Sequence, residues 1–289
     1  MYFPDDNFLI APSRKALQEM LDTCNEYAKN HNLKFSTDPN PIKSKTKCLK
    51  FLMNEREISK LKLGNDLLPW VTNGKHLGNN LENIINGLKK DMSIKRARYI
   101  DRNNELQQEF FFAHPETKVK VNRIYNTHFT GSPLWDLFSR ESEMIENTYN
   151  VSIRAMFDIP RQTHKYFIEP LTQQKHLKAL LIRRFLSFIE QIKKCPKDVV
   201  KVVLNTIKHD VASTTGSNLR NILLMMGKDN PDDLCPEDSN LVRYHPIPEE
   251  ESWRLQILTE LLNERQHNLN IEGFTTEELD DLVHIICTS

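Results

Sequence analysis

The sequence predicts a protein of the α+β class that is mostly α-helical. From Leu81 onward, apolar residues recur at helical spacing in one long segment after another. Before that point the apolar segments are short, alternate with polar residues and are separated by turn residues. Glycine is scarce, with 8 residues in 289, which favours helices over glycine-rich β-sandwiches or phosphate loops.

The first eighty residues predict a small α+β part. Residues 1–11 alternate around Pro4-Asp5-Asp6-Asn7, a pattern typical of a hairpin. Ser13 is an N-cap for a helix that ends near His31, and a proline-containing loop is expected over 37–44. Short strands are expected over 33–35, 48–52, 58–63 and 67–72, the last two joined as a hairpin through 64–66.

The remainder of the chain predicts helices. They are expected over 81–112, 116–129, 139–157, 174–193, 196–211, 216–226, 250–266 and 276–286. Residues 229–250, rich in proline and acids, are typical of a linker or an extended crossover. We therefore expect three parts: an α+β part over 1–80, a helical body over 81–228 and an acidic linker with C-terminal helices over 229–289.

The charge is distributed unevenly although the net charge is zero. Residues 229–289 contain 15 Asp and Glu against 3 Arg and no Lys, so the first 228 residues carry a net charge of +12. A basic body with an acidic tail favours a surface that binds polyanions. The alternative is that these charges only solvate the surface.

Several classes of protein are not indicated. The five cysteines are scattered without a C-x-x-C pair, which argues against a disulfide framework or a zinc knuckle. No apolar run approaches the ~18 residues that span a bilayer, and no basic-then-apolar leader is present. We expect a soluble intracellular protein with no membrane partner; whether nuclear or cytoplasmic is left open.

The carboxylate pair Asp5-Asp6 has two interpretations. Pro231-Asp232-Asp233 repeats the triplet Pro4-Asp5-Asp6, and Asp is common in ordinary turns. However, a carboxylate pair at a hairpin tip, followed by a helix and an antiparallel strand, is also the layout of a polymerase palm. There, Asp side chains hold two Mg²⁺ ions ~3.5–4 Å apart, and hard oxygen ligands suit this ion.

Longer stretches of the sequence carry a resemblance to a known family. "DDNFLIAPS", "LPWVTNGKHLGNNLE", "FTGSPLWDLFSRESEMIENTYNVSIR" and "TTGSNLRNI" closely resemble the reverse transcriptase of LINE-type non-LTR retrotransposons, in a jockey- or CR1-like lineage. The resemblance covers essentially the whole chain in the right order. It implies a palm remnant of hairpin, helix and antiparallel strands over 1–80, a thumb- and connection-like helical body over 81–228, and C-terminal helices.

The resemblance also implies roles for individual residues. Asp5 and Asp6 match the Y-x-D-D turn, which binds Mg²⁺ and is catalytic in the family. Lys43, in the loop that follows the palm helix, matches the lysine that can protonate the leaving pyrophosphate. Lys75, His76 and Gly78 match the hairpin near the primer terminus. Trp135, Phe138, Tyr149 and Phe157 are instead expected in the hydrophobic core.

A group of basic residues lies on or near the helix expected over 81–112. By the resemblance they would contact phosphates of an RNA template and a DNA primer, through charge and without sequence preference. The alternative is a solvated helix face, and no specific protein partner is indicated. These residues are Lys89, Lys90, Lys95, Arg96, Arg98 and Arg102.

The chain also departs from the family. It approaches the turn as Tyr2-Phe3-Pro4-Asp5 instead of Tyr-Ala-Asp-Asp, and Pro4 removes a backbone donor from that strand. Because the sequence begins at this turn, we expect the fingers and the strand with the third carboxylate to be missing. The chain alone would then bind no Mg²⁺ stably and be inactive, and the apolar residues 8–10 would be partly exposed.

Three functional hypotheses follow. The first is a truncated RNA-directed DNA polymerase that retains nucleic-acid binding. The second is a non-enzymatic helical interaction or scaffold protein derived from a retroelement. The third is that Met1 is an artefact of gene modelling and that a complete polymerase is encoded.

Overall fold

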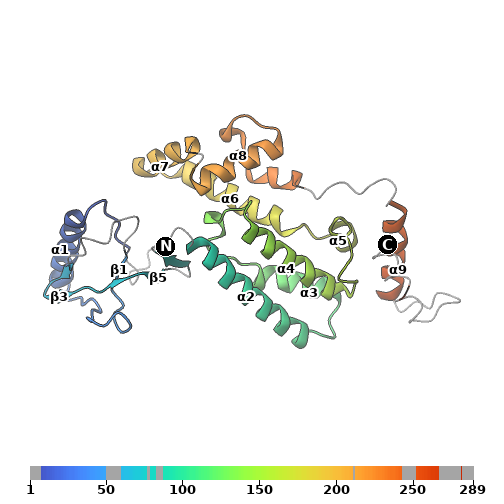
Figure 1. Cartoon of the computed structure of the whole chain (residues 1–289), viewed down its shortest axis with the longest axis horizontal. Helices are drawn as coiled ribbons and strands as arrows, with labels where there is room; N and C mark the ends of the chain where they lie inside the picture. The colour runs from blue at the N-terminus through green and yellow to red at the C-terminus, as the bar shows by residue number, and fades with distance from the viewer. Residues whose placement is uncertain are drawn as a thin grey trace. The chain divides into compact units, whose positions relative to one another are not determined.

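The computed structural model describes residues 8–49, 60–76, 79–82, 87–210, 212–242, 252–266 and 281. It is mostly helical with a few short strands, so the predicted α+β, mostly α class is confirmed (Figure 1). The chain forms two compact units, residues 1–91 and 92–289, each of which has its own hydrophobic core. Within the described segments, no helix combines the length and the apolar character needed to cross a membrane.

The first unit begins with helix α1, Arg14–Asn30, where the sequence predicts it. The Ser13 hydroxyl accepts a hydrogen bond from the Ala16 amide at 3.2 Å and so caps the helix. After the helix, Asn32 adopts a left-handed conformation with φ 54°, and the Leu33 amide bonds back to the Ala28 carbonyl. The strand expected over 33–35 is not formed, because these bonds turn the chain at the helix end.

Three short two-stranded pairings follow. Strand β1, Cys48–Leu49, pairs in parallel with β4, Trp70–Val71. Strands β2, Lys62–Leu63, and β3, Asp66–Leu67, form the predicted antiparallel hairpin, whose turn places Gly64 at φ 63°.

The third pairing joins β5, Asn73–His76, to β6, Asn79–Glu82, in antiparallel register from Asn73 opposite Glu82 to His76 opposite Asn79. The prediction of a helix from residue 81 is therefore wrong at its start. Residues 81 and 82 pair with β5, and the helix begins at Gly87.

A side chain of α1 covers the edge of the β2–β3 hairpin. The Gln18 amide nitrogen donates to the Lys62 carbonyl at 2.8 Å, and the Lys62 amide donates to Gln18 Oε1 at 3.0 Å. Beneath this contact lies a small core that includes Leu21, Cys48 and Leu61. Burial raises the pKa of the Cys48 thiol to about 11, which keeps it protonated and unreactive near neutral pH.

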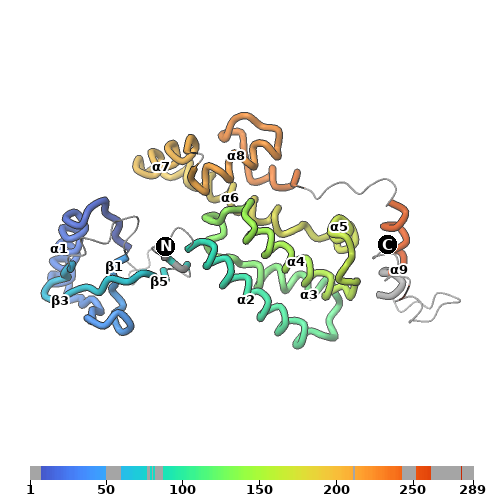
Figure 2. Tube along the Cα trace, viewed as in Figure 1, coloured from blue at the N-terminus to red at the C-terminus, as the bar shows by residue number. Residues whose placement is uncertain are grey.

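The second unit is helical (Figure 2). Helix α2, Gly87–Glu109, leads into it, and α3, Pro115–Val121, continues as a π-helical turn, η1, Asn122–Asn126. The further elements are η2 Ser132–Leu134, α4 Arg140–Phe157, α5 Lys165–Thr172, α6 Leu177–Lys194, α7 Asp198–His209, α8 Thr214–Met226, η3 Pro231–Asp233, η4 Pro236–Leu241 and α9 Ser252–Gln266.

Most of these helices lie where the apolar spacing predicts them. Helix α5 was not predicted, because it is short and contains Pro170. Apart from residue 281, the helix expected over 276–286 lies outside the described residues. Residues 229–250 were expected as a linker or an extended crossover; in their described part η4 packs against α6, and Val242 is buried in the core.

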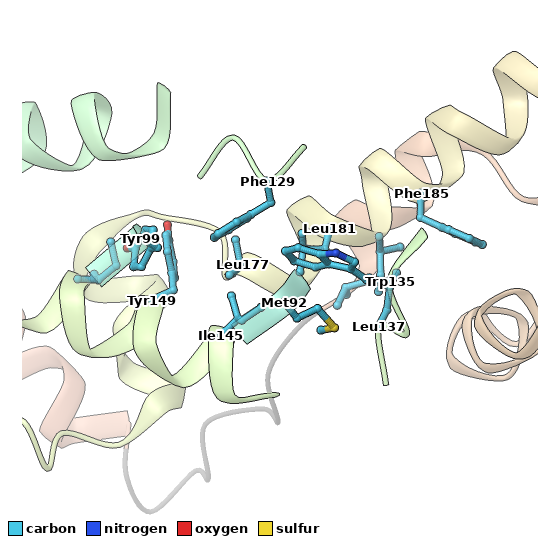
Figure 3. Close-up of a cluster of buried hydrophobic side chains, with 14 of the residues drawn as sticks. Met92, Tyr99, Phe129, Trp135, Leu137, Ile145, Tyr149, Leu177, Leu181 and Phe185 are labelled. Atoms are coloured by element: carbon cyan, nitrogen blue, oxygen red, sulfur yellow. The ribbon is translucent and has the colours of Figure 1, made fainter. Parts of the chain in front are cut away.

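The core of the second unit is built around α6 and the segment that precedes α4. Trp135 lies among Met92, Leu181 and neighbouring side chains (Figure 3). Trp135, Tyr149 and Phe157 are buried and Phe138 is partly buried, as predicted. This core fixes one face of α2 and leaves its other face to solvent.

Candidate nucleic-acid interface

The structure places the predicted site residues on several elements. Asp5, Asp6 and Gly78 lie outside the described residues, so their roles stay predictions. Among the residues that the structure does describe, no group of three or more His, Cys, Asp and Glu is arranged to hold a metal ion. The predicted site residues that the structure describes are basic side chains.

Lys43 is held in an ordered turn. Its amide donates to the Asn40 carbonyl at 3.1 Å, and Asn40 Oδ1 accepts from the Ile42 amide at 2.9 Å. The next residue, Ser44, is buried and its hydroxyl donates to the Thr46 carbonyl at 2.6 Å. The predicted loop is thus fixed from within, and the Lys43 side chain is exposed on it, so its role stays a prediction.

The hairpin that contains Lys75 and His76 is present. Lys75 is exposed on β5, while the His76 ring stacks on Phe8 with ring centroids 4.9 Å apart. Phe8 and Ile10 are 46% and 76% exposed, as expected for the apolar residues after the Asp pair. His76 is therefore engaged with the N-terminal segment, whereas Lys75 is presented to solvent.

Helix α2 carries the largest set of predicted contacts. Four of its basic side chains are exposed: Lys89, Lys90, Arg98 and Arg102. The first turn contains Lys89 and Lys90 and no acid. Because the N-terminal end of a helix carries partial positive charge, cations there oppose the helix dipole, whereas an anion would be favoured. An anion at the first turn of α2 would thus be attracted by the helix dipole as well as by the lysine side chains.

Two other basic residues of α2 point inward. Lys95 is only 7% exposed; its ammonium donates to the Thr130 carbonyl and lies over the Trp135 ring, 5.6 Å from its centroid. Arg96 is half-buried and its Nε donates to Thr148 Oγ1 at 2.7 Å. These side chains tie α2 to its neighbours, so Lys95 is corrected from a phosphate contact to a packing residue.

The sequence contains a signal that explains Lys95. Met92, Lys95, Tyr99 and Leu106 recur at spacings of three, four and seven residues and are all buried. Lysine can place its apolar stem in such a stripe when the ammonium finds a partner. The partners, a carbonyl and a Trp ring from residues 130–135, are distant in the sequence, which is why helical spacing alone did not identify the role.

Arg123 and Arg184 were not predicted as site residues. They come from η1 and α6, and no linear motif joins them. Burial, followed by the nearby Arg123 charge, lowers the pKa of the Arg184 guanidinium from its usual value. Burial also raises the pKa of Tyr149, on which Arg123 acts in the opposite direction, so this phenol stays neutral.

Comparison with protein-family models, curated proteins and solved structures yields no match to this chain.

Proposed function

We propose that this protein binds nucleic acid through exposed basic side chains of α2. More specifically, we propose that it derives from the reverse transcriptase of a LINE-type non-LTR retrotransposon, with a palm remnant followed by a thumb-like helical body. The observation that carries the binding proposal is the exposure of Lys89, Lys90, Arg98 and Arg102 on one helix, with a first turn that lacks acids.

The expected contact is electrostatic. Lysine and arginine side chains on a rigid helix neutralise backbone phosphates and release counterions, which gives affinity without reading the base sequence. Lys75, exposed on β5, would add a phosphate contact near a primer end. In a complete active site, Asp5 and Asp6 would hold Mg²⁺, which aligns a primer hydroxyl and a triphosphate, and Lys43 would donate a proton to the leaving pyrophosphate.

Salt-dependent binding tests the proposal. Fluorescence anisotropy would follow a labelled RNA–DNA hybrid with the wild-type chain and with the variant K89Q/K90Q/R98Q/R102Q. The slope of log affinity against log salt should fall by about 0.9 for each phosphate that the variant no longer neutralises, so by about 3 to 4 in total. The matched control neutralises four exposed lysines elsewhere, as K15Q/K29Q/K34Q/K197Q.

The control variant should bind like the wild type. If both variants lose the same affinity, the binding is a property of total charge and not of α2. If the wild-type chain shows no salt-dependent binding, the proposal fails.

The polymerase ancestry has its own tests. Reading the DNA upstream of the Met1 codon should show an open frame for a strand with the third metal-binding Asp if a complete enzyme is encoded. Any Mg²⁺-dependent primer extension on an RNA template should be abolished by Asp5→Asn. Extension that survives this substitution would remove Asp5 from the catalytic role.

A second candidate function, a helical protein-interaction module, is favoured by one observation. Helix α7 leaves Val199, Val202 and Val203 exposed, at 75%, 64% and 50%. Exposed β-branched residues on one helix face are typical of protein contact surfaces. Salt-insensitive co-purification of a partner that is abolished by Val199→Ser and Val202→Ser would support this role over nucleic-acid binding.

A further inference from the structure

Two lysines from neighbouring helices of the second unit hold the same carboxylate oxygen. Lys193 lies near the end of α6 and Lys208 near the end of α7, and these two helices are in contact (Figure 1). The Lys193 ammonium lies 3.0 Å and the Lys208 ammonium 2.7 Å from Oδ1 of Asp232, which belongs to η3. Because both ammonium groups contact one oxygen, two positive charges that repel each other are held close together by an anion between them.

The lysines are covered more than the carboxylate that they hold. The side chains of Lys208 and Lys193 are 14% and 25% exposed, whereas that of Asp232 is 56% exposed. Hydrogen bonds from Lys208 and from Lys193 lower the pKa of the Asp232 carboxyl from its usual value, so it is charged near neutral pH. Two helices thus fix the cationic part of the contact, and the anion lies at the surface.

A second acid of the same segment has a different role. The Asp238 side chain is only 9% exposed, and both of its oxygens accept from the Lys228 ammonium at 2.8 Å. Its Oδ2 also accepts from the Cys235 amide at 2.8 Å, and Lys228 donates to the Asp233 carbonyl at 2.8 Å. These bonds hold the segment without the Asp232 carboxylate, whose contacts in the described part of the chain are with Lys193 and Lys208.

The lysine pair can also bind a phosphate. Both ammonium groups share one carboxylate oxygen here, whereas a phosphodiester offers two non-bridging oxygens, one for each ammonium. Exposed ion pairs are weak, because water and salt screen them. An incoming polyanion can therefore displace the exposed Asp232 side chain, which makes this side chain an internal competitor for the lysines.

We propose that Lys193 and Lys208 form a binding site for a backbone phosphate of nucleic acid, which the carboxylate of Asp232 occupies in this structure and so masks. This inference rests on the proposed nucleic-acid binding. It adds a contact outside α2 and a form of regulation, in which the acidic segment that follows α8 limits the affinity of the basic body for its ligand.

Asp232→Asn tests the masking, because asparagine keeps the size of the side chain and removes its charge. Fluorescence anisotropy with the full chain and a labelled RNA–DNA hybrid should show binding about five- to tenfold tighter than the wild type at ~0.1 M salt. The slope of log affinity against log salt should steepen by about 0.9, the value for one additional phosphate. Asp233→Asn removes the same charge from the next, exposed residue and should leave the slope unchanged.

The gain must also depend on the two lysines. Adding Lys193→Gln and Lys208→Gln to the Asp232→Asn variant should remove the gain. Adding Lys194→Gln and Lys201→Gln instead neutralises two exposed lysines of the same two helices and should preserve it. An equal loss in both triple variants would overturn the assignment. Circular dichroism melting of each variant identifies any weakening that comes from unfolding.

Chemical footprinting locates the contact directly. In the Asp232→Asn variant, bound hybrid should protect Lys193 and Lys208 from acetylation, as measured by mass spectrometry, while Lys194 should stay reactive. Unprotected Lys193 and Lys208 in the bound state would contradict the proposed site.

The outcomes separate this inference from the proposed function. If the wild type binds and the α2 variant weakens binding, while Asp232→Asn equals the Asp233→Asn control, this inference is wrong and the proposed function stands. If Asp232→Asn binds inorganic phosphate in calorimetry but gains no affinity for the hybrid, the site takes free phosphate and its assignment to nucleic acid is wrong. If neither the wild type nor Asp232→Asn binds the hybrid, both proposals fail.

Discussion

At the scale of single residues, Asn218 shows how a buried polar side chain fixes the second unit. Its side chain is fully buried; Oδ1 accepts from the Leu137 amide at 3.0 Å, and Nδ2 donates to the Trp135 carbonyl at 2.7 Å. These backbone groups lie in the irregular segment between η2 and α4, which has few backbone–backbone hydrogen bonds of its own. The Asn218 amide therefore supplies both a donor and an acceptor that the segment lacks.

Asn218→Ala should destabilise the protein by about 3 kcal/mol, because it leaves two buried backbone groups unpaired at ~1–3 kcal/mol each. Urea denaturation followed by tryptophan fluorescence measures this, since Trp135 lies at the contact. Asn205→Ala on the exposed face of α7 is the control and should change stability by less than ~0.5 kcal/mol. Equal midpoints for the two variants would contradict the role of Asn218.

At the scale of elements, the α7–α8 corner depends on a glycine. A Cβ at Gly216 would lie 2.1 Å from the Asp210 carbonyl oxygen and 2.7 Å from that of Ile207. The Gly216 amide also donates to Ser213 Oγ at 3.0 Å, the N-cap bond of α8. The close approach of the end of α7 to the first turn of α8 is thus possible only without a side chain at this position.

Gly216→Ala is expected to be destabilising although alanine favours helices by about 1 kcal/mol over glycine. The backbone of α7 must move to admit the methyl group, so we expect a loss of roughly 2 kcal/mol or more. Hydrogen exchange should show faster opening of α7 and α8, while α4 stays protected. Arg220→Ala on the same helix is the control, and a stabilised Gly216→Ala variant would contradict the argument.

The elements also show what the sequence could and could not predict. Helices α1, α4 and α8 have serine N-caps, and α1 and α4 begin within two residues of where caps and apolar spacing place them. The β5–β6 hairpin was expected only from the family resemblance, because its strands carry polar residues such as Asn73 and Asn79 and show no period-two pattern.

The same distinction applies to the candidate site. Exposed basic residues such as Arg98 and Arg102 follow from helical spacing. The inward position of Lys95 depends on a contact with a residue 35 positions away along the chain, and Arg184 donates to a carbonyl 57 positions away. Local sequence patterns do not predict contacts between residues so far apart in the chain, so these contacts are known only from the folded structure.

At the scale of the whole molecule, the two units have separate cores of unequal size. The described core of the first unit has five buried apolar residues, and that of the second has twenty-five. The free energy gained from apolar burial scales with the area removed from water. The second unit should therefore be the more stable, and the first should unfold at a lower temperature.

Calorimetry should then resolve two unfolding transitions. Leu61→Ala should lower the midpoint temperature of only the first transition, and Ile182→Ala that of only the second. Each substitution should reduce the unfolding free energy of its unit by the ~2–5 kcal/mol that is typical when a large core side chain is truncated. A single transition that both substitutions shift equally would show that the units unfold as one. In that case the small core is stabilised by the larger one.

The hydrogen bonds between Gln18 and Lys62 affect the tendency of the protein to aggregate through its strand edges. A short hairpin leaves amides and carbonyls along its rim, and such a rim invites strand exchange between molecules and, eventually, aggregation. Here an amide side chain from the neighbouring helix occupies both groups of one rim residue. A single glutamine thus occupies backbone groups that an additional strand would pair in a larger sheet, and it protects this edge of a two-stranded hairpin from pairing with another molecule.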